Sequence, residues 1–381
     1  MKKNEIVKRY GSDPMEMTVS LLEYVGLKDH IADKNTCIGI KPNLVNSTPA
    51  SFGATTHPEV VEGLISYLRA HGYDNIVIAE GSWVGDRTAD AFEYCGYNSL
   101  AKRCGVRLID TQKVKSHIAD CAGMELSLCD TVDEIGFMIN VPVLKGHCQT
   151  RVTCALKNMK GMIPNSEKRR FHTMGLHKPI AHLSKGIHQD FILVDHICGD
   201  PDFEEGGNPV KTDCVMAGFD PVLIDAYACR ILGLSASDVP YIGMAEQLGA
   251  GSSELSSATV TIINEASEVI KKFSADDDDP YEQEFKPENR VLDVAYEIDD
   301  VDSCSACYGS FVGALYRLKE EGIYRDGCLP RMSIGQGHRG RGGVLGIGNC
   351  CKQFDEYIRG CPPREEDIYR FLRDKIDAQL V

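Results

Sequence analysis

The first 250 residues alternate short, β-rich apolar runs with helical patterns, and this alternation constrains the fold more than any other feature. The runs that predict strands are TCIGI (36–40), NIVIAE (75–80), VRLID (106–110), GFMINVPVL (136–144), FILVD (191–195) and CVMAG (214–218). Two segments between or after them, 58–72 and 220–233, carry helical apolar stripes and begin with a proline. The alternation predicts an α/β fold, a mainly parallel sheet wrapped by helices. Ligands of such sheets usually bind beyond the carboxyl ends of the strands.

A change in composition predicts where this α/β region ends. The polar and acidic run SADDDDPYEQEFKPEN (274–289) is typical of a surface linker rather than of a metal site. Dense glycine and cysteine follow from about residue 296. We therefore expect an α/β domain over 1–255, a strand and acidic linker over 256–295, and a small cysteine-rich region over 296–381.

Charge and length exclude several classes of function. The 381 residues carry a formal net charge of −15, which argues against general nucleic-acid binding. No apolar run is long enough to span a bilayer, and the charged N-terminus lacks the apolar stretch of a signal peptide. We expect a cytoplasmic protein, in which the 16 cysteines are thiols or metal ligands rather than disulfides.

Six cysteines lie in the last eighty residues and form a candidate metal centre. Cys304 and Cys307 make a C-x-x-C pair at the start of a helical pattern, Cys350 follows the Gly-rich GGVLGIG, and Cys361 precedes Pro362. Thiols near helix N-termini and Gly-rich turns are stabilised as thiolates, as an iron–sulfur cluster requires. These four residues predict one [4Fe-4S] cluster, with structural zinc as the alternative. Cys351 is an alternative to Cys350 as a ligand, and we interpret Cys328 as structural.

A basic segment, residues 143–185, follows the apolar strand predicted at 136–144. It contains nine Lys or Arg residues against one acid, Glu167, in an otherwise acidic protein. Cations, hydroxyls and imidazoles placed after a strand indicate a small anionic ligand, although a solvated basic face would give the same charge pattern. We expect acid–base roles for Lys145, His147 and Lys157. The segment's other candidate ligand-binding residues are Thr150, Thr153, Asn158, Lys160 and His172.

Several stretches together resemble the DUF362 family over roughly residues 35–250. They are KPNLV (41–45), THPEVVEGLISYL (56–68), VPVLKGHCQTRVTCALKNMKG (141–161), EKRRFH (167–172), LVDHICG (193–199) and AGFDPVLIDAYACRILGL (217–234). The resemblance adds Lys41, Asn43, Glu80, Asp195 and Asp225 to the candidate substrate-binding residues. Many family members carry iron–sulfur centres in a ferredoxin-like insert, whereas this chain lacks such a run and has its cysteine-rich tail instead.

The tail has a resemblance of its own. GNCC…GCPPREEDIY (348–369) resembles the end of the cluster-binding small subunits of respiratory complex I and nickel–iron hydrogenases. Together the features indicate an iron–sulfur oxidoreductase or electron-transfer component that acts on a small anionic metabolite or cofactor, with an electron-donor protein as a partner. The alternatives are a non-redox lyase, isomerase or transferase with a structural cluster, and a non-catalytic sensor or cofactor-maturation protein. The sequence leaves open whether the chain forms a homodimer.

Overall fold

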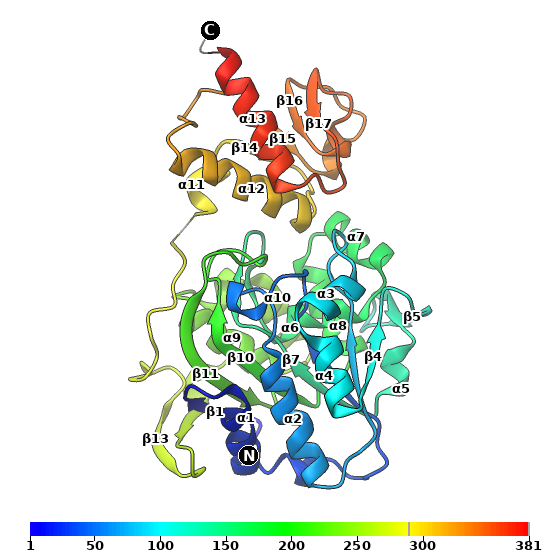
Figure 1. Ribbon diagram of the computed structural model, residues 1–381, viewed down its shortest axis with the longest axis vertical. Coiled ribbons are helices and arrows are strands. Elements are labelled where there is room, and N and C mark those ends of the chain that lie inside the picture. The colour runs from blue at the N-terminus through cyan, green and yellow to red at the C-terminus, as the bar shows by residue number, and fades with distance from the viewer. Residues whose placement is uncertain (289, 380–381) are drawn as a thin grey trace. The chain divides into compact units, whose positions relative to one another are not determined.

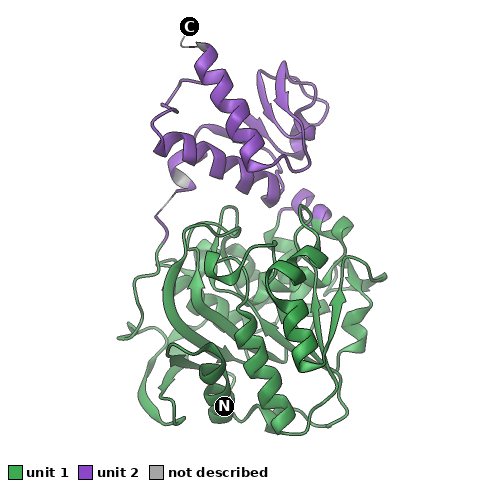
Figure 2. Cartoon of the chain, in the orientation of Figure 1, with its two compact units in different colours: residues 1–168, 176–286 green, residues 169–175, 287–381 purple. Residues whose placement is uncertain are grey.

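The chain forms two compact units, which are coloured separately in Figure 2. A computed structural model describes residues 1–288 and 290–379. The first unit comprises residues 1–168 and 176–286, and the second comprises residues 169–175 and 287–381. The boundary in the linker thus lies at 286–287, so that the strands after residue 255 belong to the first unit.

A nine-stranded sheet forms the centre of the first unit (Figure 1). Its strands, in spatial order, are β13 (Val269–Ser274), β12 (Thr259–Ile263), β1 (Glu5–Tyr10), β11 (Val210–Gly218), β10 (Phe191–Gly199), β7 (Phe137–Val141), β2 (Ile38–Pro42), β3 (Ile76–Glu80) and β4 (Arg107–Asp110). All but β11 and β13 run in the same direction. The expected α/β fold with a mainly parallel sheet is confirmed.

Helices cover both faces of this sheet. They are α1 (Pro14–Val25), α2 (Pro58–Ala70), α3 (Thr88–Tyr94), α4 (Tyr97–Cys104), α5 (Thr131–Glu134), α6 (Ala155–Asn158), α7 (Asn165–Thr173), α8 (His177–Gly186), α9 (Pro221–Ile231) and α10 (Pro240–Gln247). The expected starts at Pro58 and Pro221 are confirmed, and Asp220 caps α9 by accepting from the Val222 and Leu223 N–H groups. None of the described helices is long and apolar enough to cross a membrane.

Successive side chains of β7 point to opposite faces of the sheet, and helices pack on each of these faces. Phe137, Ile139 and Val141 join the apolar core formed with α1, α2 and α4. Asn140 points to the opposite face, where its Nδ2 donates to the Ala155 carbonyl of α6. Two short hairpins complete the unit, β5 (Ser116–Asp120) with β6 (Glu125–Cys129), and β8 (Lys145–His147) with β9 (Arg151–Thr153). The β8–β9 hairpin begins just beyond the carboxyl end of β7.

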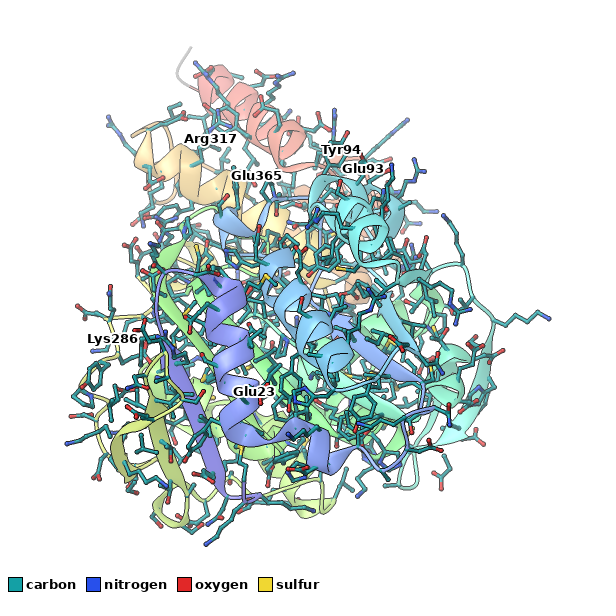
Figure 3. The ribbon with its side chains drawn as sticks, turned by 60° about the horizontal axis from the view of Figure 1, so that its bottom comes forward. Glu23, Glu93, Tyr94, Lys286, Arg317 and Glu365 are labelled. Atoms are coloured by element: carbon teal, nitrogen blue, oxygen red, sulfur yellow. The ribbon has the colours of Figure 1, made fainter. Side chains whose placement is uncertain are left out.

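The second unit contains a four-stranded parallel sheet and two long helices. The elements are α11 (Leu292–Ala295), β14 (Ile298–Asp300), α12 (Ser305–Glu320), β15 (Met332–Ile334), β16 (Leu345–Ile347), β17 (Glu356–Ile358) and α13 (Glu365–Gln379), with strand order β14-β15-β16-β17. The helices α12 and α13 pack against each other. Arg317 on α12 and Glu365 at the start of α13 are labelled in Figure 3, and Arg317 Nη1 lies 3.0 Å from Glu366 Oε2.

The acidic segment expected to be a surface linker is anchored to the first unit. Lys8 on β1 is fully buried and forms ion pairs with Asp279, at 2.6 Å, and with Glu282. Glu282 Oε1 also lies 2.8 Å from His196 Nε2, and Phe285 is buried. The segment therefore follows the surface of the sheet with two of its carboxylates turned inward, because a buried lysine requires anionic partners.

We expect Lys8→Met to destabilise the first unit by about 3–5 kcal/mol, because the substitution leaves two close carboxylates without their cation. Urea unfolding measures the change in the free energy of unfolding. The control is Arg230→Met, since Arg230 pairs with Asp278 at 2.9 Å on the surface and is expected to contribute at most about 1 kcal/mol. Equal losses in the two variants would contradict the buried anchor.

Candidate functional site

Most of the predicted residues gather at the carboxyl ends of β2, β3 and β7. These residues lie on adjacent strands or in the β8–β9 hairpin and α6 that follow β7. The side chains of Lys41, Asn43, Glu80, Lys145, His147, Thr150, Thr153, Lys157 and Asn158 are buried. Lys160 is half-buried, and His172 lies in the segment 169–175 that groups with the second unit. The predicted residues of the first unit form two clusters with different chemistry.

The first cluster, which we name the Lys41 cluster, is centred on an ion pair between neighbouring strands. Lys41 Nζ lies 2.8 Å from Glu80 Oε2 and donates to the Pro42 carbonyl at 2.7 Å. Glu80 also accepts from the backbone N–H groups of Leu44 and Gly81. Because the charges and lone pairs of this cluster are satisfied within the protein, its geometry favours a structural role.

An asparagine pair joins the Lys41 cluster to β7. Asn158 Nδ2 donates to Asn140 Oδ1 at 2.7 Å, and Asn158 Oδ1 lies 3.4 Å from Lys41 Nζ. Asn140 was not predicted from the sequence, because it lies inside an apolar strand. Gly161 closes the cluster, since a Cβ atom at this position would lie 2.2 Å from Glu80 Oε1 and 2.4 Å from Lys41 Cε. The glycine of the LKNMKG stretch is therefore required for the close approach of this turn to the ion pair.

The second cluster, which we name the Glu204 cluster, is centred on a residue that was not predicted. Glu204 Oε2 lies 2.6 Å from Lys157 Nζ, and Glu204 Oε1 lies 3.1 Å from His147 Nε2. Lys145 Nζ donates to the Glu204 carbonyl at 2.8 Å and to the Ala54 carbonyl. All three residues expected to act in acid–base chemistry thus contact one glutamate.

The loop that carries Glu204 connects β10 and β11. Asp200 organises it by accepting from the N–H groups of Asp202, Phe203 and Asn208. Gly146 donates to the Asp200 carbonyl at 2.7 Å, and a Cβ atom on Gly146 would lie 2.1 Å from the Pro201 carbonyl oxygen. The glycine of the LKGH stretch therefore allows this loop to lie directly against β8.

His147 is held in one tautomer. Its Nδ1 accepts from the backbone N–H groups of Gln149 and Thr150, both at 3.0 Å, so in the neutral ring the proton resides on Nε2. Burial lowers the pKa of His147 to about 4. The negative charge of Glu204 acts to raise this pKa, but the positive charges of Lys157 and Lys160 counteract Glu204. Nε2 is close to Glu204 but makes no aligned hydrogen bond within the described structure. The geometry thus presents a neutral imidazole with a buried N–H.

The charges of the Glu204 cluster follow from burial and pairing. Burial lowers the pKa of Lys145 to about 7, against the opposing effect of Glu204. Burial raises the pKa of Glu204, but the neighbouring His147 and Lys157 lower it more strongly. The pKa of Glu204 therefore lies well below its usual value. The cluster therefore contains one ionised carboxylate, which pairs with Lys157, and a second lysine, Lys145, that titrates near neutral pH.

Other predicted residues are occupied by the protein itself. Asp195 accepts from both the N–H and the Nδ1 of His57, at 2.7 and 2.8 Å. Asp225 accepts from the N–H groups of Ala155 and Leu156 and so stabilises the start of α6. Thr150 Oγ1 donates to the Val152 carbonyl, whereas Thr153 Oγ1 is buried with no partner in the described structure. The predicted substrate-binding roles of Asp195 and Asp225 stay predictions. Their contacts give each of the two residues a structural role.

The four predicted metal ligands of the second unit act on one another. Cys304 caps α12, Cys307 lies in its first turn, Cys350 lies in a 3₁₀ turn (Asn349–Cys351) and Cys361 precedes α13. A hydrogen bond from Cys307 lowers the pKa of Cys304 to about 7. The same bond, burial and the charges of Cys304, Cys361 and Cys350 raise the pKa of Cys307. The charges of these four thiols therefore act on one another, and their role as metal ligands stays a prediction.

The alternative cysteines point elsewhere. Cys351 is buried and its Sγ lies 3.3 Å from the Ser333 carbonyl oxygen, whereas Cys350 interacts with Arg339. Cys328 accepts from the Arg325 N–H at 3.5 Å within a turn. All 16 cysteines are free. Among the described residues, no group of three or more His, Cys, Asp or Glu side chains surrounds a point at single-ion distance.

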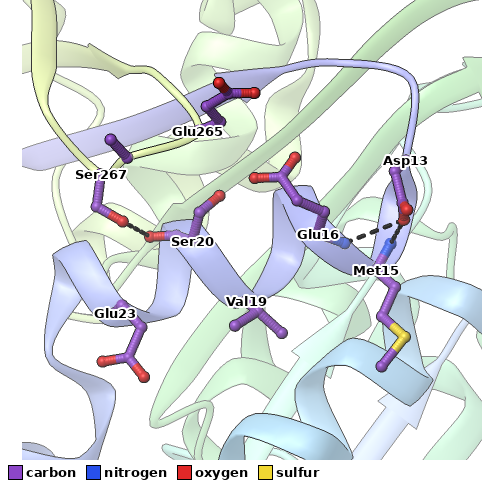
Figure 4. A pocket seen from close by; sticks show the side chains of 9 residues that line it. Asp13, Met15, Glu16, Val19, Ser20, Glu23, Glu265 and Ser267 are labelled. Atoms are coloured by element: carbon purple, nitrogen blue, oxygen red, sulfur yellow. Dashed lines mark hydrogen bonds between the residues drawn. The ribbon is translucent and has the colours of Figure 1, made fainter.

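A surface groove lies away from both clusters. It has a volume of about 550 Å³ and runs beside α1 (Figure 4). Its lining residues are Asp13, Met15, Glu16, Val19, Ser20, Glu23, Glu265, Ala266 and Ser267. Asp13 caps α1, and Ser267 Oγ donates to the Ser20 carbonyl at 2.8 Å, so the polar groups drawn with dashed lines have structural partners.

Comparison with known proteins identifies a family and two distant folds. The family described as Domain of unknown function (DUF362) matches residues 38–230. The chain is 23% identical over 241 residues to the thylakoid-associated protein sll1697 of Synechocystis sp., which covers 60% of this chain and 73% of that protein. Similar solved structures are the lactate racemase apoprotein of Thermoanaerobacterium thermosaccharolyticum (14% identity, TM-score 0.41) and a Thermotoga maritima protein (12% identity, TM-score 0.37). They cover 61% and 62% of this chain, which matches 57% and 60% of theirs.

We expect Gly161→Ala to destabilise the first unit by about 1–3 kcal/mol, because the added methyl group displaces the Lys41–Glu80 pair. Urea unfolding tests this expectation. The matched control is Gly243→Ala on α10, where nothing lies within 4 Å of the new methyl group. The control should be neutral or stabilising by about 0.5–1 kcal/mol, because alanine favours a helix over glycine. Similar changes in both variants would contradict the close contact.

We expect His147 to stay neutral at pH 6, with its proton on Nε2, and to titrate only near pH 4. Nitrogen-15 NMR of labelled histidine measures both the tautomer and the pKa. His57 is the internal control, because Asp195 outweighs burial and raises the pKa of His57 above its usual value. Its ring should therefore be protonated at the same pH. If both rings titrated together between pH 6 and 7, the arrangement around His147 would be wrong.

Proposed function

The chain belongs to the DUF362 family, whose domain spans about half of its residues, and we propose that it is an iron–sulfur protein that binds a small anionic metabolite or cofactor. The observation that supports the proposal is that the thiols of Cys304, Cys307, Cys350 and Cys361 act on one another electrostatically in the second unit. We propose redox or electron-transfer chemistry as the activity.

The donor set of the second unit fits a [4Fe-4S] cluster. Four free thiols come from three separate segments, as cluster ligands commonly do. Cys304 sits at the N-terminus of the 16-residue helix α12, where partial positive charge favours thiolate. Arg339 interacts with Cys350 and, through its charge, with Cys361 and Cys304. These four residues would hold the cluster, which supplies one-electron transfer when bound.

The first unit supplies the features expected of an anion site. Lys157 pairs with Glu204, Lys145 titrates near neutral pH and His147 presents an N–H, all at the carboxyl edge of the sheet. In the proposed function these groups bind and orient the ligand, and Lys145 exchanges a proton near neutral pH. The Lys41 cluster holds the neighbouring strand ends in place. Solvent weakens the attraction between an exposed lysine and an anion, whereas Lys145 and Lys157 are buried, so that their attraction to an anion is screened less.

We expect protein purified without oxygen to contain about four irons and four sulfides per chain, because four thiolates match one [4Fe-4S] cluster. Metal and sulfide analysis measures the content, and low-temperature EPR with and without dithionite measures reduction. Colourless protein that holds stoichiometric zinc would end the iron–sulfur proposal. A cluster that is present but cannot be reduced would favour a structural role and a non-redox reaction.

Neighbouring cysteines provide matched variants for this experiment. Cys350→Ser should lower the iron content or change the EPR signal, since serine replaces a proposed ligand. Cys351→Ser, one residue away, should retain both, because the Cys351 thiol lies against the Ser333 carbonyl. The reverse outcome would assign the ligand to Cys351. Circular dichroism of both variants verifies that the second unit is folded.

A further inference from the structure

Glu205, next to Glu204, carries a carboxyl group whose partner is not within the described structure. Both carboxyl oxygens are buried and neither has a hydrogen-bond partner among the described residues. The backbone of Glu205 is held, because Asn46 Nδ2 donates to its carbonyl at 3.1 Å. A buried polar group without a partner costs about 1–3 kcal/mol, so native proteins satisfy nearly all such groups. An orphan carboxyl beside a cationic cluster therefore points to a ligand.

The two adjacent glutamates differ in charge. Glu204 is ionised because Lys157 and His147 contact its oxygens. Burial and the charge of Glu204 raise the pKa of Glu205 to about 8, so this carboxyl carries a proton at neutral pH. A pair of carboxyl groups with opposite protonation states is the arrangement by which active sites separate a proton donor from an anion.

Other hydrogen-bond donors of the cluster lack an aligned acceptor. His147 Nε2 belongs to a fully buried side chain and lies 3.1 Å from Glu204 Oε1, but no aligned hydrogen bond joins them in the described structure. Thr153 Oγ1 is also buried and has no hydrogen-bond partner in the described structure. Thr153 lies opposite Lys145 in the β8–β9 hairpin. An imidazole N–H, a hydroxyl and a protonated carboxyl are each able to donate a hydrogen bond to an oxyanion.

The charge balance of Lys145, Lys157 and Glu204 favours a ligand with one negative charge. Lys157 is matched by Glu204 at 2.6 Å, whereas the hydrogen bonds of Lys145 within the described structure go to neutral oxygens. One uncompensated cation is balanced by a carboxylate and overbalanced by a doubly charged phosphate. The titratable groups that act on Glu205 or on its neighbours are Lys145, His147, Cys148, Lys157, Lys160, Asp200 and Glu204.

We propose that Glu205 is the proton-carrying residue of a site for a small organic carboxylate, to which its carboxyl group donates a hydrogen bond while Lys145 and Lys157 supply the positive charge. This inference rests on the anion site of the proposed function and names its ligand class and a binding residue. It also explains why the buried, unpartnered carboxyl oxygens of a half-buried glutamate lie next to an ionised one.

The experiment uses acetate as the probe, with inorganic phosphate as the comparison, on the full chain by calorimetry from pH 6 to pH 9. Wild-type protein should bind acetate, and its affinity should fall as Lys145 and then Glu205 lose their protons. Glu205→Gln keeps a neutral hydrogen-bond donor that cannot titrate. Above pH 8, the affinity of this variant for acetate should therefore fall with each pH unit by a factor about tenfold smaller than in wild type. The reason is that one fewer proton is linked to binding. The control is Glu265→Gln, which changes an exposed residue on the turn between β12 and β13. Its affinity for acetate should fall with pH as steeply as that of wild type.

The outcomes separate this inference from the proposed function. An unchanged slope in Glu205→Gln, with acetate still bound, would overturn the role of Glu205 and leave the anion site standing. Tighter binding of phosphate than of acetate at pH 7 would overturn the carboxylate assignment. If neither anion bound while the iron and sulfide content was intact, the anion site itself would be wrong. If Glu205→Gln does not fold, infrared spectra of wild type labelled with carbon-13 glutamate provide a second test. They should show a protonated carboxyl band that shifts with acetate and disappears above pH 8, and the absence of that band would overturn the proposal.

Discussion

Burial of lysine is the constraint on which the first unit depends. Lys8, Lys41 and Lys145 are fully buried, and a buried ammonium group is tolerated only with anionic or several neutral acceptors. Each lysine therefore recruits a distant segment: Lys8 draws in the acidic segment after β13, Lys41 joins β2 to β3, and Lys145 holds the β10–β11 loop. These contacts determine where the loops at the carboxyl edge of the sheet can lie, and so they also shape the candidate site.

The sequence predicted what depends on local pattern. Strand runs and proline starts are local signals, and the sheet and the starts of α2 and α9 agree with them. Candidate residues that follow strands, such as Glu80 and His147, were found for the same reason. Glu204 and Glu205 were missed because PDFEEGGNP has the composition of an ordinary polar turn. Their importance comes from Gly146, which lies more than fifty residues earlier and lets their loop reach the hairpin.

Residue type alone did not separate ligand-binding from structural roles. Asp195 and Asp225 lie near the predicted site, yet one holds His57 and the other caps α6. Cys350 and Cys351 are adjacent and chemically identical, and only the direction of each side chain distinguishes them. The acidic run after β13 was interpreted from its average composition, whereas two of its carboxylates are turned toward a lysine that lies some 270 residues away in the sequence. Such roles are decided by tertiary contacts that no short window of sequence contains.

The two units leave complementary groups for ligands. In the second unit, the four predicted ligand thiols act on one another, and Arg339 interacts with the thiol of Cys350. In the first unit, Glu205, His147 and Thr153 have buried polar atoms without an aligned partner among the described residues, and Lys145 donates to carbonyl oxygens. Because folded proteins satisfy their buried polar groups, such unpartnered atoms favour a bound ligand. The proposed anion of the first unit would satisfy these atoms, and the proposed cluster of the second unit would use the thiols of its helix start and turns, so each proposal depends on groups that the fold leaves available.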